Sequence, residues 1–164
     1  MGFINCDNRS ADASNDTLTR SRIREFARKE VANNSYARGL TLLVSSDMIG
    51  RGPRLQIEDD LGCNEVIERS FNSWANEIQL SEKLKTGKIA KMVDGEVFLV
   101  FYRDKKLKSS SKLNVKLLES EQIANPYGLS YEQEVDGIDL DDNGDPLYYY
   151  VLKQHPGSTY YKHL

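Results

Sequence analysis

Residues 93–102, VDGEVFLVFY, decide the fold class. The Asp94-Gly95 pair is a turn signal, and a nearly continuous apolar run follows it up to Tyr102. Such a run predicts a strand, and its continuity indicates burial on both faces. A basic, Ser-rich loop then leads to residues 113–118, which alternate between apolar and polar and predict the returning strand of a hairpin.

Upstream of this hairpin, apolar residues recur with helical spacing. Asp16 or Thr17 is placed to cap the first helix, and Ser35 is placed to cap the second. Asn33 and Asn34 are expected to end the first helix because Asn tolerates the left-handed conformation there. We expect four helices, at about residues 17–33, 36–48, 62–78 and 80–92.

The first helix is expected to be amphipathic. Ile23, Phe26 and Val31 share one face, whereas the arginines of residues 20–29 lie mostly on the other. This pattern predicts that the apolar face packs inward. Beyond the second helix, a Gly- and Pro-containing break is followed by alternation at residues 55–57, which predicts a short strand.

The clearest hairpin lies near the C-terminus. Residues 135–140 and 147–152 flank Asn143-Gly144, a signal of a two-residue turn in which both central residues need positive φ. Residues 120–124 predict one helical turn. Helices that precede strands favour an α+β fold, with N-terminal helices packed on an antiparallel sheet of hairpins. The expected strands cover residues 95–102, 113–118, 135–140 and 147–153. Residues 1–16 are expected to form a flexible arm, and residues 17–164 one domain.

Charge is distributed unevenly along the chain. The net charge of −3 over 164 residues excludes a generic nucleic-acid binder. The region from Arg20 to Arg54 is basic, whereas the region from Asp136 to Asp145 is acidic. This asymmetry suits a subunit whose two flanks meet different neighbours. No apolar window is long enough to cross a bilayer, so we expect no membrane association.

Catalytic and metal-binding patterns find little support. His155 lies in a Gln-His-Pro-Gly stretch and is interpreted as a turn residue, not a base. Asp94 and Glu96 flank a turn without an acid/base partner. Cys6 and Cys63 belong to no zinc-binding pattern. We therefore expect no enzymatic activity, no cofactor, and no catalytic or metal site.

Two alternative functions rest on charged motifs. The loop from Asp139 to Asn143 matches the opening of a calcium loop and would make the chain a small calcium-dependent binding module. Tyr150 stands where the closing Glu is required, which favours a hairpin turn instead. The helix from Arg20 to Lys29 would make it a small DNA-binding protein, although Glu25 and Glu30 interrupt its basic character.

Four stretches, in the same order, resemble lambda-type phage portal proteins. An Arg-rich helix, a helix ending in an Ile-Gly-x-Gly segment and a Leu-Gln pair occupy residues 20–57. A Trp-containing helix, FNSWA, occupies residues 71–75, and VDGEVF occupies residues 93–98. Residues 136–157, DGIDLDDNGDPLYYYVLKQHPG, are similar to the hairpin and His-Pro-Gly segment of the family. The resemblance covers most of the chain after residue 17 and nothing before about that point.

The resemblance implies a structural subunit and no enzyme. Portal subunits form a ring at one capsid vertex, through which DNA is packaged and ejected and the head joins the tail. The implied partners are other portal subunits, capsid and scaffold proteins, the terminase, a head-tail adaptor, and passing phage DNA bound without sequence specificity. The implied location is the portal vertex of the virion, after assembly in the cytoplasm of the bacterial host.

Family members are longer than this chain. The resemblance therefore implies that residues 17–164 hold the N-terminal portion of a portal wing domain, with the stem and clip absent. A split gene, a prophage remnant and an excised fragment are equally compatible with this. Such a chain is expected to be mainly monomeric or weakly self-associating. The opposed charges of its basic and acidic regions would make that association sensitive to salt.

Overall fold

The computed structural model describes residues 10, 14–58, 64–125, 134–135 and 137–158. The expected arm, the start of the third expected helix and the approach to the last hairpin lie largely outside the described residues. Four helices come first: α2 (Thr17–Asn33), α3 (Ser35–Ile49), α4 (Asn64–Glu77) and α5 (Leu80–Asp94). The strands and one short 3-10 helix follow: β1 (Phe98–Arg103), β2 (Leu113–Leu118), η1 (Ser120–Gln122), β3 (Glu134–Val135), β4 (Ile138–Leu140) and β5 (Pro146–Tyr149).

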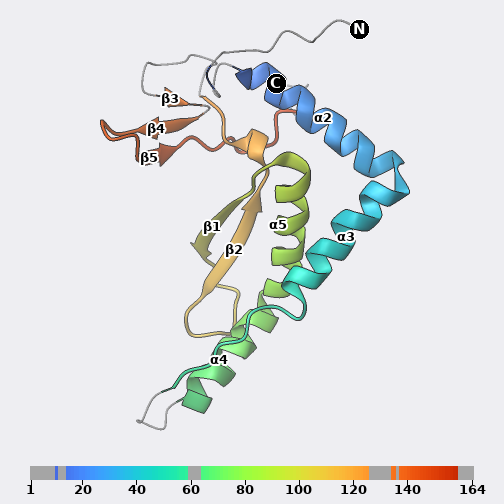
Figure 1. The fold of residues 1–164 in the computed structure, drawn as a ribbon. Coiled ribbons are helices and arrows are strands. Elements are labelled where there is room, and N and C mark those ends of the chain that lie inside the picture. The colour runs from blue at the N-terminus through green and yellow to red at the C-terminus, as the bar shows by residue number, and fades with distance from the viewer. Residues whose placement is uncertain (1–9, 11–13, 59–63, 126–133, 136, 159–164) are drawn as a thin grey trace, which may run out of the picture.

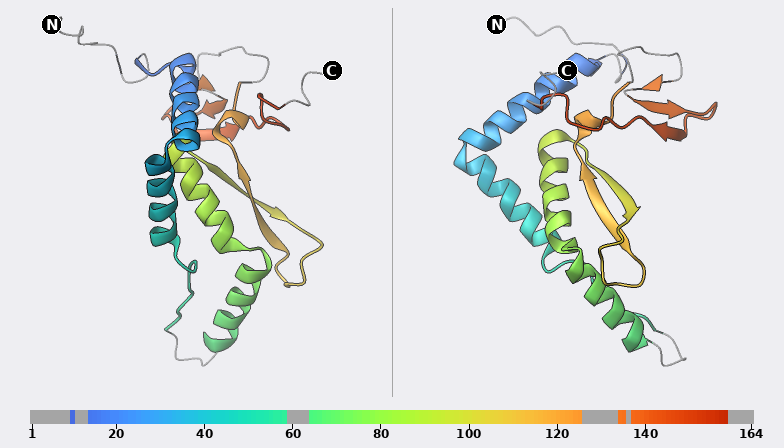
Figure 2. Two further views of the ribbon diagram at one scale, coloured as in Figure 1. Left: turned by 90° about the vertical axis from the view of Figure 1, so that its right-hand side faces the viewer. Right: turned by 180° about the vertical axis from the view of Figure 1, so that it is seen from behind.

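The elements form an elongated α+β structure, which confirms the expected class. β1 and β2 make one antiparallel hairpin, and β3, β4 and β5 make a separate antiparallel sheet in that order. α5 lies between α3 and the β1–β2 hairpin, and α4 extends away from the lower end of α5 (Figure 1). The β3–β5 sheet lies at the other end, near α2, as the views in Figure 2 also show.

The junction between the first two helices depends on a single residue, Asn34. Its backbone is extended, with φ −108° and ψ 112°, and its side chain accepts a hydrogen bond from the Tyr36 N–H at 2.9 Å. Its own N–H donates to the Glu30 carbonyl and closes α2. Asn34 therefore caps both helices, so the expectations of a left-handed Asn here and of capping by Ser35 were wrong. An N-cap residue needs extended backbone, which rules out the left-handed ending.

The start of α2 follows the sequence pattern. Asp16 is the N-cap, and its side chain accepts a hydrogen bond from the Thr19 N–H at 2.7 Å. This bond satisfies one of the free backbone donors at the start of the helix. Asp16, rather than Thr17, therefore fixes where α2 begins.

The hydrophobic core lies where the α4–α5 junction meets β2. Ile78, Leu80, Leu107 and Val115 are its buried members, and partly buried side chains, including that of Trp74, surround them. The Trp74 Nε1–H donates to the carbonyl of Leu113 at 2.7 Å, which ties α4 to the start of β2. A partly buried indole of this kind contributes both apolar area and a directed hydrogen bond.

The loop between β1 and β2 is fixed to the end of α4. Both carboxylate oxygens of Glu77 accept backbone hydrogen bonds, from the N–H groups of Lys108 and Ser109. These bonds favour the charged carboxylate, so they lower the pKa of Glu77. The loop thereby carries Leu107 into the core.

The side chains of β1 are much more exposed to solvent than its apolar sequence indicates. Phe101 is 64% exposed, and Leu99, Val100 and Tyr102 are exposed as well, so the expected burial on both faces was wrong. In the described part of the chain, β1 pairs only with β2, from Phe98 opposite Leu118 to Arg103 opposite Leu113. A two-stranded sheet covered by a helix on one side leaves the other face and one edge open.

Residues 55–57 form no strand in the described structure, so the short strand expected there was wrong. The segment runs beside α4 (Figure 1), and the Ile57 N–H donates to Glu68 Oε1 at 3.0 Å. The donor that a strand partner would use is thus taken by a side chain of α4. Alternation over three residues carries no information about whether a partner strand exists.

The turn between β4 and β5 is longer than a two-residue Asn-Gly turn. Gly144 has φ +85°, but Asn143 is not among the positive-φ residues. Asp141 organises the loop instead, because its side chain accepts hydrogen bonds from the N–H groups of Asn143 and Asp145 at 2.9 and 2.8 Å. A loop with glycine at its left-handed position is a common alternative hairpin connection.

Candidate functional site

The inner side of α2 is held to the body of the protein by arginines. Arg28 Nε donates to Asp94 Oδ1 at 2.7 Å, and its Nη1 donates to Glu121 Oε2 at 3.0 Å. One turn earlier, Arg24 donates to Glu96 Oε1 and to the Asp94 carbonyl, both at 3.2 Å. We call these five residues the arginine junction. It joins α2 to the end of α5, the start of β1 and η1.

Partial burial strengthens the arginine junction. The side chain of Asp94 is only 10% exposed and that of Glu121 is 20% exposed. The hydrogen bond that Arg28 donates to Asp94 raises the pKa of Arg28 far above its ordinary value. Burial opposes this shift, and the hydrogen bond to Glu121 adds to it. Burial alone would raise the pKa of Glu121, but the hydrogen bond and charge of Arg28 outweigh it and lower that pKa. Both carboxylates are therefore matched by a fixed cation.

His155 extends the arginine junction to the C-terminal segment. Its Nε2 hydrogen-bonds to Glu121 Oε2 and lies 3.4 Å from Glu119 Oε2. Its Nδ1 accepts from the Gly157 N–H at 3.0 Å, and its carbonyl accepts from the Ser158 N–H. His155 is thus a turn residue, as its sequence context indicates, and it brings this segment onto η1.

The sequence pattern does not indicate the arginine junction. In the sequence, Asp94 and Glu96 are carboxylates without an acid/base partner, and the apolar stripe of α2 predicts that its arginines lie on the outer face. The structure pairs both carboxylates with arginines, and it leaves Ile23 and Phe26 on the outside, with Phe26 68% exposed. The available signal was the spacing of Arg24 and Arg28, which places both side chains on one helix face.

The solvent-exposed surface of α2 and α3 carries an unusual number of large apolar side chains. Large exposed apolar residues on these helices are Leu18, Ile23, Phe26, Tyr36, Leu40, Leu42, Leu43 and Met48. We call this surface the α2–α3 outer face. A monomeric protein rarely exposes so many large apolar groups together, and such surfaces mark contacts with other proteins.

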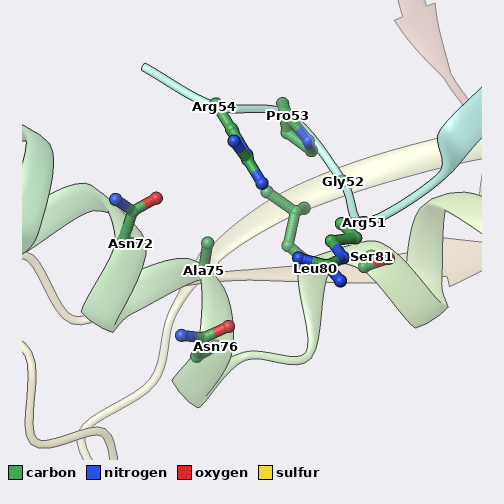
Figure 3. Close-up of a pocket in the computed structure, with 9 residues that line it drawn as sticks. All are labelled: Arg51, Gly52, Pro53, Arg54, Asn72, Ala75, Asn76, Leu80 and Ser81. Carbon is green, nitrogen blue, oxygen red and sulfur yellow. The ribbon is translucent and has the colours of Figure 1, made fainter. Parts of the chain in front are cut away.

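A polar cleft of about 410 Å3 opens where the segment after α3 passes the α4–α5 junction (Figure 3). Arg51 and Arg54 enter it from the segment, and their guanidinium groups lie on either side of Leu80 (Figure 3). Its other polar lining residues are Asn72, Asn76 and Ser81. We call it the arginine cleft. The segment approaches closely at Gly52, where an added Cβ would lie 3.2 Å from the Ser81 Cβ.

The model of one protein family matches almost the whole chain. The family is "Phage portal protein, lambda family", and the match covers residues 2–163. The chain belongs to the lambda family of phage portal proteins. The match begins well before Thr17, so the view that the resemblance covers nothing upstream of that residue was wrong. No curated protein matches the sequence.

Portal proteins of this family are structural, and this one has a structural role in the portal of the phage capsid, in the machinery of DNA packaging. The arginine junction fits that role because its charged groups pair with one another. Among the residues that the structure describes, no three His, Cys, Asp or Glu side chains gather closely enough to hold a metal ion. In the same part of the portal protein, no helix has the length and apolar character needed to span a membrane.

The calcium alternative meets a specific obstacle in this portal protein. Calcium binding at the loop from Asp139 to Asn143 would need the Asp141 carboxylate as a ligand. One oxygen of that carboxylate already accepts two backbone hydrogen bonds within the loop. The hydrogen bond from the Asp145 N–H lowers the pKa of Asp141 most, against a smaller opposing effect of burial. The carboxylate thus caps the turn. The DNA-binding alternative loses two of its cations, because Arg24 and Arg28 belong to the arginine junction.

Proposed function

We propose that the chain forms part of the wing region of a portal ring at one capsid vertex. Through this ring DNA enters during packaging and leaves during ejection, and the head joins the tail. The observation that carries the proposal is the family match over residues 2–163. The α+β fold, with helices leading and hairpins following, agrees with it.

The exposed apolar surfaces support an assembled subunit. The α2–α3 outer face and the open side of β1 both present large apolar side chains to solvent. A subunit in a closed ring buries different faces against its two neighbours, and each contact of this kind needs on the order of 1,000 Å². Residues 17–164 are proposed to act as one wing unit, built around the core at the α4–α5 junction.

The proposed partners follow from the place of a portal in the particle. They are other portal subunits, capsid and scaffold proteins, the terminase, a head-tail adaptor, and DNA contacted without sequence specificity. Assembly is proposed to take place in the cytoplasm of the host, and the final location is the portal vertex of the virion. No catalytic step is assigned to the chain, and no cofactor is needed for the proposed role.

An interruption of the reading frame tests the proposal. Phage made from a genome in which this frame carries an early stop codon should yield capsids without packaged DNA, because the entry channel is missing. Supply of the intact frame in trans should restore DNA-filled particles, and a frame with synonymous changes serves as the control. Infectious, DNA-filled particles from the interrupted genome would show that the proposed role is wrong.

A further inference from the structure

The arginine cleft offers hydrogen-bond donors with nothing to satisfy them. No described residue forms a hydrogen bond or ion pair with the guanidinium of Arg51 or Arg54. Among the residues that the structure describes, no acidic side chain lines the cleft, and its other polar groups are two asparagine amides and one serine hydroxyl. Two guanidinium groups that line one cleft favour partners with two planar anionic groups, such as a pair of carboxylates. The chemistry of the cleft therefore calls for an acidic ligand.

The β4–β5 hairpin carries a matching group, which we call the acidic tip: Asp142 and Asp145. Both side chains are exposed, and no described residue pairs with either carboxylate. Asp141 holds the backbone of this loop, through its hydrogen bonds to the N–H groups of Asn143 and Asp145. The tip is therefore a preorganised pair of free carboxylates, which reduces the entropy that binding would cost.

The acidic tip cannot reach the arginine cleft of its own chain. The β3–β5 sheet lies beside α2 at one end of the structure, whereas the cleft lies at the α4–α5 junction toward the other end (Figures 1 and 2). The hairpin also makes none of its principal contacts with α4 or α5. A partner for the tip must therefore come from a different molecule.

We propose that the acidic tip of one copy of this chain inserts into the arginine cleft of the next copy. The contact joins two different surfaces, so it is head-to-tail and can propagate around a ring. The inference rests on the proposed function, because it supplies a contact between neighbouring portal subunits. The proposal fixes how the two copies dock: Asp142 and Asp145 of one copy contact Arg51 and Arg54 of its neighbour.

Nucleic-acid phosphate is the chief rival occupant of the arginine cleft. Duplex DNA presents a row of phosphates, and proteins that bind it without sequence preference line up several cations along that row. Two arginines are the cations that line this cleft among the described residues, and the chain as a whole has a net charge of −3. Two carboxylates on a narrow hairpin match this arrangement better than a phosphate row does.

Zero-length cross-linking tests the contact directly. A carbodiimide joins an amine to a carboxylate only when the two touch, so the Arg54→Lys variant places a reactive amine in the cleft while keeping its charge. An equal mixture of ¹⁵N-labelled and unlabelled chains identifies links between copies by mass spectrometry. We expect mixed-isotope peptides that join position 54 to Asp142 or Asp145. The Arg22→Lys variant, altered on exposed α2 surface, is the matched control and should give no such peptide.

Charge reversal tests the same contact by its energetics. Arg51→Glu with Arg54→Glu should weaken self-association about tenfold in sedimentation velocity, because two favourable ion pairs become repulsive. Asp142→Lys with Asp145→Lys should do the same. A mixture of these two proteins should regain association, since each then offers the charge that the other needs. The control reverses Arg22 and Arg38, which are exposed elsewhere and change the net charge equally.

Three results would overturn the inference. The first is the absence of the tip-to-cleft peptide. The second is self-association that survives both reversals; in that case the portal role stands and only this contact fails. The third is tight binding of a mixed-sequence duplex that requires Arg51 and Arg54, which would assign the cleft to phosphate. Failure of the portal role itself would appear separately, as DNA-filled particles from the interrupted frame.

Discussion

Removal of the Arg28 charge should loosen α2 from the body of the protein. The Arg28→Met variant keeps most of the aliphatic stem but leaves Asp94, whose side chain is 10% exposed, without its 2.7 Å partner. A hydrogen bond to a charged group contributes about 1.5–3 kcal/mol. The second pair, with Glu121, is more exposed and keeps His155 as a neighbour, so it adds about 0.5 kcal/mol.

The two contributions predict a loss of about 2–3.5 kcal/mol in the free energy of unfolding, and a midpoint temperature lower by about 4–14 °C. Urea and thermal unfolding, followed by circular dichroism, measure both quantities. The Arg22→Met variant is the control, since Arg22 lies on the exposed side of the same helix, and it should change stability by less than about 0.5 kcal/mol. If Arg28→Met proves as stable as Arg22→Met, the arginine junction does not hold α2 in place.

Three further predictions follow from single contacts. Gly137→Ala should lower the free energy of unfolding by more than about 3 kcal/mol, because the added Cβ would lie 2.6 Å from the Ala124 backbone at a position with φ +82°. Gly144→Ala is the control: its φ is similar but the space around it is open, so it should cost only about 1 kcal/mol. Equal losses for the two variants would contradict this prediction. Trp74→Phe should cost about 0.5–1.5 kcal/mol in urea unfolding, because the hydrogen bond to the Leu113 carbonyl is lost, and an unchanged urea midpoint would argue against that bond. The pKa of Glu121 in the folded state lies below its ordinary value of 4.5, so the Glu121 carboxylate stabilises the fold above about pH 4.5, and this contribution is lost as the pH falls further. The stability of Glu121→Gln should therefore decline less steeply in acid than that of the unaltered chain. Parallel pH profiles of stability would refute the assignment.

Local sequence signals predicted the elements well because their causes are local. Asp16 begins α2 by capping its first turn, and the turn at Asp94-Gly95 ends α5 just before β1. The two strands around the basic loop pair in register, as their spacing predicts. Each of these features depends on residues within a few positions of one another, which is what a single sequence displays.

The orientation of α2 was not predictable in the same way. Its apolar residues suggested one inner face, but Arg28 pairs with Asp94 and Glu121, which lie 66 and 93 residues further along the chain. Nothing in the helix itself shows that its docking surface is acidic. The exposure of β1 has a similar cause, since the number of strands that pair beside an apolar run is a property of the whole sheet.

The arginine cleft is not predictable from the sequence either. Arg51 and Arg54 belong to a broadly basic region of the chain, and the side chains that complete the cleft come from α4 and α5. The acidic region is evident in the sequence, where its pattern matches the opening of a calcium loop. Only the fold shows that Asp141 is used within the loop and that Asp142 and Asp145 remain free.

Localisation of the chain in assembled particles tests the central claim most directly. Virions from a host that carries this sequence can be labelled with gold-conjugated antibody against an epitope tag inserted at the exposed Ser110. After mild opening of the capsid, electron microscopy should show gold at a single vertex, the one that bears the tail. Gold spread over many vertices or capsid faces, or its absence from particles that contain DNA, would contradict a role in the portal.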